Sequence, residues 1–102
     1  MQNRIDSLIG LATRAGRTVS GEDTVIKSVR DGTARVVFIS AEASAGTRKK
    51  FQDKCTYYGV PYYIRGSLEE LGKVTGKPFR AVVAVTDQGF ANELINILSG
   101  GG

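Results

Sequence analysis

The chain has 102 residues, of which 41% are hydrophobic and 24% charged, and these proportions are those of an ordinary globular protein. It contains no histidine and one cysteine. This composition excludes a histidine general base, a Ser-His or Cys-His nucleophile pair and a zinc site. We therefore expect that the protein is not an enzyme and binds no metal or cofactor. Its net charge is +4, and no apolar run approaches the roughly 20 residues of a membrane span.

Hydrophobic periodicity predicts helices and strands in alternation along the chain. The N-terminal segment is an amphipathic helix that ends near Gly16 and lacks the apolar core of a signal peptide. Two nearly continuous apolar runs, 34–40 and 81–85, are typical of central strands covered on both faces. Pro61 fits an edge strand or a first strand position, and residues 67–70 form a capping box. The predicted order is helix 2–15, strand 17–19, helix 21–31, strand 34–40, helix 45–58, strand 60–65, helix 67–76, strand 81–85, and a last helix that begins at Thr86 or Asp87 and runs to Leu98.

This alternation predicts one α/β domain, because no linker or internal repeat interrupts the chain. We expect a three-layer α/β/α sandwich with a small mixed sheet of about four strands, formed by residues 1–98. Residues 99–102 are predicted to be a flexible tail. The single Cys55 cannot form an internal disulfide and occupies a buried helix position, so we expect a core residue in a monomeric, cytoplasmic protein without a membrane partner.

The most informative segment is the turn at Ser20 and Gly21, where a short strand runs directly into a segment of helical period. A helix start carries unpaired N–H groups and a partial positive charge, which suit a phosphate or a base acceptor. Gly21 leaves room for a ligand to approach the backbone, and Lys27 projects from the same helix. The alternative is that Ser20 or Asp23 only caps the helix and that Lys27 is a solvated surface residue.

Positive charge is concentrated in the first part of the chain. Residues 81–102 contain two acidic residues and no basic one, so the first 80 residues carry a net charge of +6. Arg14 and Arg17 bracket the end of the first helix and are candidate phosphate contacts beside Lys27, and Arg14 also complements the helix dipole. Clustered positive charge is the electrostatic signature of nucleic-acid binding.

The loop of residues 77–80, Lys-Pro-Phe-Arg, places an aromatic side chain between two bases. One interpretation is that Phe79 tucks under the loop; the other is that it contacts a ligand while Lys77 and Arg80 bind phosphates. The basic run at 48–50, Arg-Lys-Lys, is interpreted as a solvated helix face. We assign four tyrosines to core or interface packing rather than to base stacking, since neighbouring strand residues point to opposite faces: Tyr57, Tyr58, Tyr62 and Tyr63.

Five segments share a pattern with a known family. They are residues 8–16, residues 19–27, the spacing of Cys55 with Val60-Pro61-Tyr62, the segment Leu71-Gly72-Lys73 with Gly76, and residues 83–91. Over residues 3–98 the chain resembles the L7Ae/L30e superfamily of ribosomal proteins that bind kink-turn RNA. The segment 83–91 resembles the bacterial YlxQ-type branch in particular.

The resemblance implies a role for the turn at Gly21. In that family a helix start with the pattern Gly-x-Asn-Glu-x-x-Lys enters the groove at tandem sheared G·A pairs; Gly21 and Lys27 match it, and Lys27 is implied to reach a guanine edge. Asp23 and Thr24 stand where the family has Asn and Glu, and Glu22 is implied to supply the carboxylate one residue early. The RNA-binding residues implied in this way, together with the flanking bases and the loop, are Arg14, Arg17, Gly21, Glu22, Asp23, Thr24, Lys27, Lys77, Phe79 and Arg80.

We therefore predict a cytoplasmic RNA-binding protein that recognises a kink-turn or a similar internal loop of structured RNA in the ribosome or another ribonucleoprotein. The competing hypothesis is a protein–protein adaptor or regulatory module on the same fold, because a fold does not fix a function. A neutral, apolar surface around Gly21, with basic residues scattered over all faces, would favour the adaptor.

Overall fold

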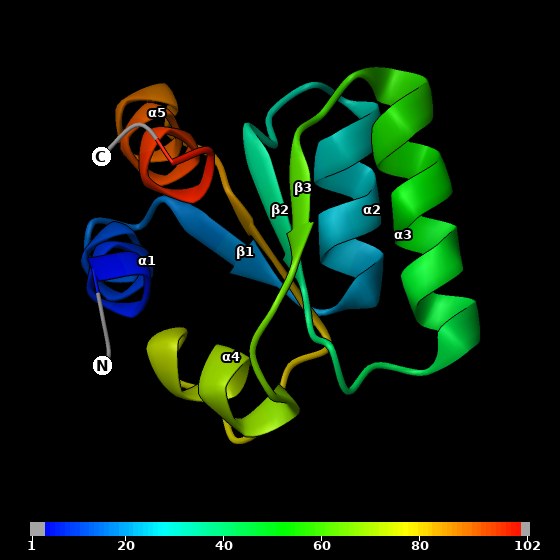
Figure 1. The fold of residues 1–102 in the computed structure, drawn as a ribbon, viewed down its shortest axis with the longest axis horizontal. Coiled ribbons are helices and arrows are strands. Elements are labelled where there is room, and N and C mark those ends of the chain that lie inside the picture. The colour runs from blue at the N-terminus through cyan, green and yellow to red at the C-terminus, as the bar shows by residue number, and fades with distance from the viewer. Residues whose placement is uncertain (1–3, 101–102) are drawn as a thin grey trace.

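The computed structural model describes residues 4–100 and contains helices and strands in the predicted alternation (Figure 1). Residues 2–3, where the first helix is predicted to begin, and residues 101–102 of the predicted tail lie outside this range. No helix within the range is both long enough and apolar enough to span a bilayer. The elements are α1 (Arg4–Arg14), β1 (Thr18–Ser20), α2 (Glu22–Arg30), β2 (Val36–Ile39), α3 (Ala45–Tyr58), β3 (Tyr62–Ile64), α4 (Leu68–Val74), β4 (Val82–Val85) and α5 (Gln88–Leu98).

The four strands form one mixed sheet in the order β1-β4-β2-β3. β4 pairs antiparallel with β1 and with β2, while β2 and β3 run parallel. Every residue of β2 and β4 is buried, which confirms that the two apolar runs are central strands. β3 lies at the edge of the sheet directly after Pro61, where the missing N–H of proline is tolerated.

Helices cover both faces of the sheet, which confirms the three-layer α/β/α sandwich (Figure 1). α2 and α3 cover one face, and their core includes the buried side chains of Val25, Phe51 and Cys55. α1, α4 and α5 cover the other face, with Ile9 and Leu94 in the second core. The alternating side chains of the central strands supply both cores, and this alternation joins the three layers.

The tyrosines divide into two pairs. Tyr62 packs against the core under α2 and α3, while Tyr63 packs against the other core, which confirms that these neighbours point to opposite faces. Tyr57 and Tyr58, at the end of α3, do not pack in either core, because they are 80% and 42% exposed.

Within residues 4–100, side chains cap three helices, and two of these caps were predicted, those of α4 and α5. Ser67 opens α4 with the complete capping box, and Ser44 accepts a hydrogen bond at the start of α3. Of the two residues considered for α5, Asp87 is the cap, because its carboxylate accepts the N–H of Phe90 at 2.9 Å. Beyond α5, the N–H of Ser99 still donates to a carbonyl of the last helical turn at 2.8 Å.

The loop of residues 77–80 is fixed on α4 by close backbone packing. The N–H of Lys77 donates to the carbonyl of Gly72 at 2.8 Å, and the N–H of Arg80 donates to the carbonyl of Leu68 at 3.0 Å. A Cβ atom on Gly72 would lie 2.7 Å from backbone atoms of the loop. The absence of a side chain at Gly72 therefore sets how closely the loop packs against α4.

We predict that Gly72→Ala destabilises the fold by about 1–3 kcal/mol, because the new methyl group overpacks the loop backbone. Gly10→Ala in α1 is the matched control, since a Cβ atom there meets no atom within 4 Å. The control gains about 0.5–1 kcal/mol, as expected for Gly to Ala in a helix. Urea unfolding of both variants measures the difference, and a gain in both would contradict the close packing.

Cys55 is fully buried, and this burial raises the pKa of its thiol from 9.0 to about 11. Because the pKa is higher in the folded protein than in the unfolded chain, the stability contributed by the neutral thiol is complete below pH 9 and is lost as the pH rises towards 11. We predict that the wild type loses stability over this interval more steeply than Cys55→Ala. Urea unfolding at several pH values tests this, and parallel curves for the two proteins would contradict it.

Candidate nucleic-acid interface

The start of α2 faces solvent. Gly21 is its N-cap residue, with φ 92° and ψ 150°, a backbone conformation that is accessible to glycine and strained for other residues. The N–H of Gly21 donates to the carbonyl of Val82 at 3.1 Å. The interpretation that Ser20 or Asp23 caps this helix is wrong, because no side-chain hydrogen bond caps α2 within residues 4–100. The N–H groups of the first turn therefore remain available to a ligand.

Strand pairing brings the loop of residues 77–80 beside this helix start. Ser20 lies opposite Val83 in the β1–β4 register, so the segment that leads into β4 reaches the end of β1. Arg80 Nε donates to Ser20 Oγ at 2.9 Å, across 60 positions of sequence. A second guanidinium nitrogen of Arg80 donates to the carbonyl of Phe79 at 3.1 Å. The charge of Arg80 is thereby held at the turn.

Phe79 projects into solvent from the same loop, with 61% of its surface exposed. The interpretation that it tucks under the loop is therefore wrong. Lys77 is exposed as well, and both side chains belong to the loop whose Arg80 contacts Ser20 beside Gly21. An apolar ring between positive charges suits a ligand that has both flat apolar surfaces and phosphates.

Glu22 is engaged by α3, which the sequence pattern did not reveal. Its carboxylate lies 3.9 Å from Lys50 Nζ and accepts a hydrogen bond from Thr47 Oγ1 at 3.4 Å. Lys50 thus belongs to the surface around the α2 start, rather than to a purely solvated helix face. Its neighbours serve other contacts: Lys49 pairs with Asp53, and Arg48 donates to backbone carbonyls of the loop before α3.

The remaining residues of α2 that the family pattern singles out are exposed. Asp23 and Thr24 make no side-chain hydrogen bond to any residue in the described range 4–100. Lys27 lies about 9 Å along the helix axis from Gly21 at 1.5 Å per residue. No ion pair within 4 Å holds Lys27 among the residues described, so its long side chain can turn towards the helix start.

At the other end of α2, hydrogen bonds from Thr33, together with the charge of Lys27, lower the pKa of the Asp31 carboxyl.

Arg17, which the sequence suggests as a phosphate contact beside Lys27, does not lie beside Gly21. The carbonyl of Arg17 accepts the N–H of Thr86 at the end of β4, whereas Gly21 bonds to Val82 at its beginning. The two residues are therefore separated by the length of β1, about 13 Å at 3.3 Å per residue.

Arg14 lies at a different feature, a hollow of about 540 Å³ between α1 and α4. Lys73 lines the same hollow, which extends to Gly76 directly before the loop of residues 77–80. Burial, and then the negative charge of Glu70, raise the pKa of Asp6 in its wall. Arg14 thus approaches the α4 side of the loop rather than the α2 start. Within the described residues, no group of three or more histidine, cysteine or carboxylate side chains is arranged to hold a metal ion.

Sequence comparisons with known proteins all point to RNA-binding and ribosomal proteins of one family. The sequence pattern of the ribosomal protein L7Ae/L30e/S12e/Gadd45 family matches residues 3–95. The RNA-binding protein YlxQ of Bacillus subtilis (strain 168) is 55% identical over 91 residues, which cover 89% of this chain and 91% of that protein. YlxQ of Enterococcus faecium is 40% identical over 92% of this chain and 90% of its own length. The large ribosomal subunit protein eL30 of Candida albicans is 32% identical over 94% of this chain and 92% of its own length.

Solved structures show the same architecture. A Bacillus halodurans protein of unknown function superimposes with a TM-score of 0.91 and 37% identity, covering 96% of this chain and 99% of that chain. The 15.5kD RNA binding protein of Giardia lamblia has the same fold at 20% identity, with a TM-score of 0.84 over 100% of this chain and 93% of that chain. The α/β/α sandwich, the match over residues 3–95 and the identity to YlxQ together show that the chain belongs to the ribosomal protein L7Ae/L30e/S12e/Gadd45 family.

Proposed function

We propose that this protein binds structured RNA through a surface formed by the α2 start and the loop of residues 77–80, here called the α2–loop surface. The observation that carries the proposal is the contact between Arg80 and Ser20, which places an uncapped helix start beside a basic and aromatic loop. Two relatives named as RNA-binding proteins, 55% and 40% identical to this chain, support RNA as the ligand. The relatives named above are RNA-binding and ribosomal proteins rather than enzymes.

Each part of the α2–loop surface offers a different kind of contact. The N–H groups of the first turn of α2 suit phosphate or base acceptors, and Gly21 allows the RNA backbone to approach closely. Lys27 supplies a donor for the acceptor edge of a guanine. Phe79 offers an apolar face to an unstacked base or a ribose, while Lys77 and Arg80 neutralise the neighbouring phosphates.

The RNA that this surface fits best is a kink-turn or a similar internal loop. A regular A-form duplex hides its base edges in a deep and narrow groove, so a helix start reaches base edges only where an internal loop widens that groove. Asp23 and Thr24 stand where the family pattern has Asn and Glu, and both side chains are free to contact a base. The Asp23 carboxylate accepts hydrogen bonds but does not donate them, which changes the choice of base.

The wider setting that we propose is a cytoplasmic monomer that works in the ribosome or another ribonucleoprotein. The competing adaptor hypothesis predicts a neutral, apolar surface around Gly21, with basic residues scattered over all faces. Instead, Lys50 and Arg80 contact the α2 start, and Lys27 and Lys77 add charge from the same helix and loop, so these four bases outnumber the carboxylates of Glu22 and Asp23. This concentration of positive charge favours RNA over an apolar protein partner.

We predict that Lys27→Ala weakens binding of a kink-turn duplex without single-stranded overhangs by about 1–3 kcal/mol, the range for one specific base contact. Arg35→Ala is the matched control, because it removes the same charge from an exposed site at the opposite end of the sheet. Isothermal titration at fixed moderate salt compares the two variants, with thermal unfolding as the check on folding. Equal losses of affinity in the Lys27→Ala and Arg35→Ala variants would show that Lys27 contributes only general electrostatic attraction.

A second prediction separates backbone strain from ligand approach. Gly21 and Gly32 both have positive φ, 92° and 83°, and a Cβ atom on either meets no atom within 4 Å. Replacement by valine costs each variant about 1–3 kcal/mol of stability from strain. Only Gly21→Val is expected also to lose affinity for the same duplex, because its side chain stands in the path of the RNA. Similar affinities for the two valine variants would show that Gly21 serves the backbone alone.

A third prediction separates charge from base recognition. Lys77→Gln should lower the slope of log K against log salt by about one unit, equally for a kink-turn duplex and for one whose G·A pairs are converted to Watson–Crick pairs. Asp23→Asn should change the ratio of the two affinities and leave the slope nearly constant. Salt titrations of both variants against both duplexes provide the test. If Lys77→Gln changed the affinity ratio and Asp23→Asn changed only the slope, the assigned roles would be reversed.

A further inference from the structure

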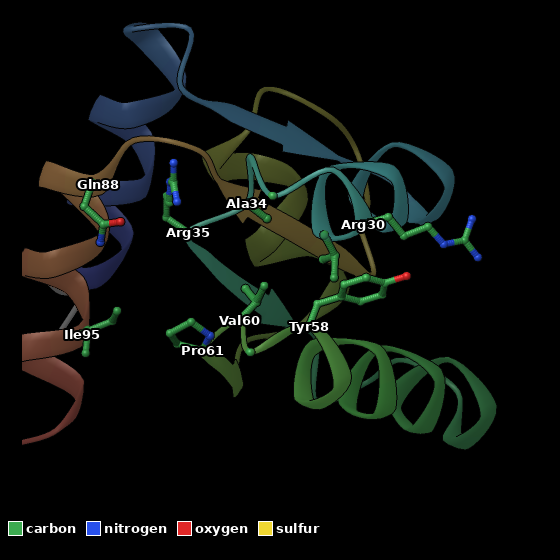
Figure 2. A pocket seen from close by; sticks show the side chains of 11 residues that line it. Arg30, Ala34, Arg35, Tyr58, Val60, Pro61, Gln88 and Ile95 are labelled. Atoms are coloured by element: carbon green, nitrogen blue, oxygen red, sulfur yellow. The ribbon is translucent and has the colours of Figure 1, made fainter.

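A second hollow lies at the other end of the sheet, away from the α2 start (Figure 2). It has a volume of about 310 Å³ and is formed where α2 and α3 end and where β2, β3 and α5 begin. Ligand pockets commonly measure roughly 300–1,000 Å³, so this hollow matches a single small group rather than a folded duplex. The turn at Gly21 is about 14 Å from Arg30 along α2 at 1.5 Å per residue.

Two arginines line this hollow. Figure 2 shows Arg35 and Gln88 on one side and Tyr58 on the other, with Ala34 and Val60 between them, while the Arg30 side chain extends outward beyond Tyr58. Both arginines are exposed, and neither guanidinium forms an ion pair or a hydrogen bond with another residue of the range 4–100. No carboxylate lines the hollow. Two uncompensated guanidinium groups around a site without acidic residues favour an anionic ligand.

An exposed pair of aromatic rings adjoins the same site. Tyr58 lines the hollow, and Tyr57 packs edge-on against it, with ring centroids 4.8 Å apart and an interplanar angle of 80°. The two rings remain 80% and 42% exposed for Tyr57 and Tyr58, respectively, although burial of such rings is favourable. An exposed ring held by its neighbour provides a flat surface for stacking, and the Gln88 amide offers both a donor and an acceptor to a base edge.

We propose that this hollow binds one nucleotide of single-stranded RNA, with its base against Tyr58 and its two flanking phosphates on Arg30 and Arg35. A nucleotide within a strand carries a phosphate on each side. Arg35 lies on one side of the hollow, and Arg30, which is exposed and extends outward beyond Tyr58, turns towards the second phosphate on binding. A free mononucleotide has its phosphate on one side only and occupies one arginine. The site goes beyond the proposed function, because it lies at the other end of α2 and leaves the α2–loop surface unobstructed.

The test uses a fluorescein-labelled adenosine RNA hexamer added to protein already saturated with an unlabelled kink-turn duplex without overhangs. Fluorescence anisotropy is expected to show hexamer binding to this complex. Arg30→Gln/Arg35→Gln should weaken it about tenfold, as expected for the loss of two phosphate contacts. Tyr58→Leu keeps the net charge and should weaken hexamer binding about fivefold or more, the range for one stacked base. Thermal unfolding and duplex affinity of each variant should match those of the wild type.

The matched control is Arg4→Gln/Lys49→Gln, which removes two positive charges from exposed ion pairs away from the hollow. It should leave the hexamer affinity within about twofold. An equal loss in the control and in the hollow variant would overturn the proposal in favour of general attraction. Competition by adenosine 5′-monophosphate or by an oligoglutamate peptide, at concentrations comparable to the hexamer, would also overturn it, since a single phosphate or any polyanion would then suffice. If the hexamer binds but the kink-turn duplex does not, the result contradicts RNA binding at the α2–loop surface and leaves the proposal for this hollow standing.

Discussion

The antiparallel pairing of β1 with β4 determines where the candidate surface lies. β1 runs directly into α2, and the loop of residues 77–80 runs directly into β4, so pairing the two strands brings the helix start and the loop to the same end of the sheet. The Gly21–Val82 backbone bond and the contact between Arg80 and Ser20 complete this arrangement. With parallel strands, the start of β4 would lie at the opposite end of β1 from the turn.

The loop is positioned from two directions. On one side it packs against α4 at Gly72, where a side chain would push the backbone away. On the other side it meets β1 through Arg80. Because the loop is held by backbone packing on one side and by the Arg80 side chain on the other, it presents Phe79 and Lys77 without first losing the entropy of a mobile segment, which favours binding.

Much of the fold was predictable, because the deciding patterns are local. Two continuous apolar runs identified the central strands, and the capping box at 67–70 identified the start of α4. The predicted bounds of the short strands differ by one or two residues from the observed ones; β1, for example, begins at Thr18 rather than at residue 17. Strand ends depend on pairing partners that local periodicity does not contain.

The candidate site was predictable only in part. Gly21 and Lys27 were identified from the glycine-to-lysine spacing of the family pattern, which is local. The contact of Glu22 with Lys50 depends on the packing of α2 against α3, which no local spacing reveals. Arg17 is near Gly21 in sequence but at the far end of an extended strand, so proximity in sequence was misleading there.

Exposed positive charge without an ion-pair partner occurs at both ends of α2. The α2–loop surface and the hollow beside Tyr58 lie at opposite ends of α2, and each contains unpaired positive charge. Away from these two ends, Arg4 pairs with Glu93 and Lys49 pairs with Asp53, whereas Arg14, Arg17 and Lys73 are exposed without an ion pair in the described range. Exposed pairs of this kind contribute little to stability, about 0–1 kcal/mol, and their main effect is to neutralise surface away from the two basic ends.

The most direct test of the α2–loop surface is an amide chemical-shift titration with a kink-turn duplex and with its Watson–Crick-paired counterpart. We expect the amide resonances of residues 22–24 and of Lys77, Phe79 and Arg80 to shift together with one common dissociation constant when the kink-turn duplex is added. The Watson–Crick duplex should produce no such set of changes at the same concentration. Changes confined to one of the two segments, or equal changes with both duplexes, would contradict the claim that they form one RNA-binding surface.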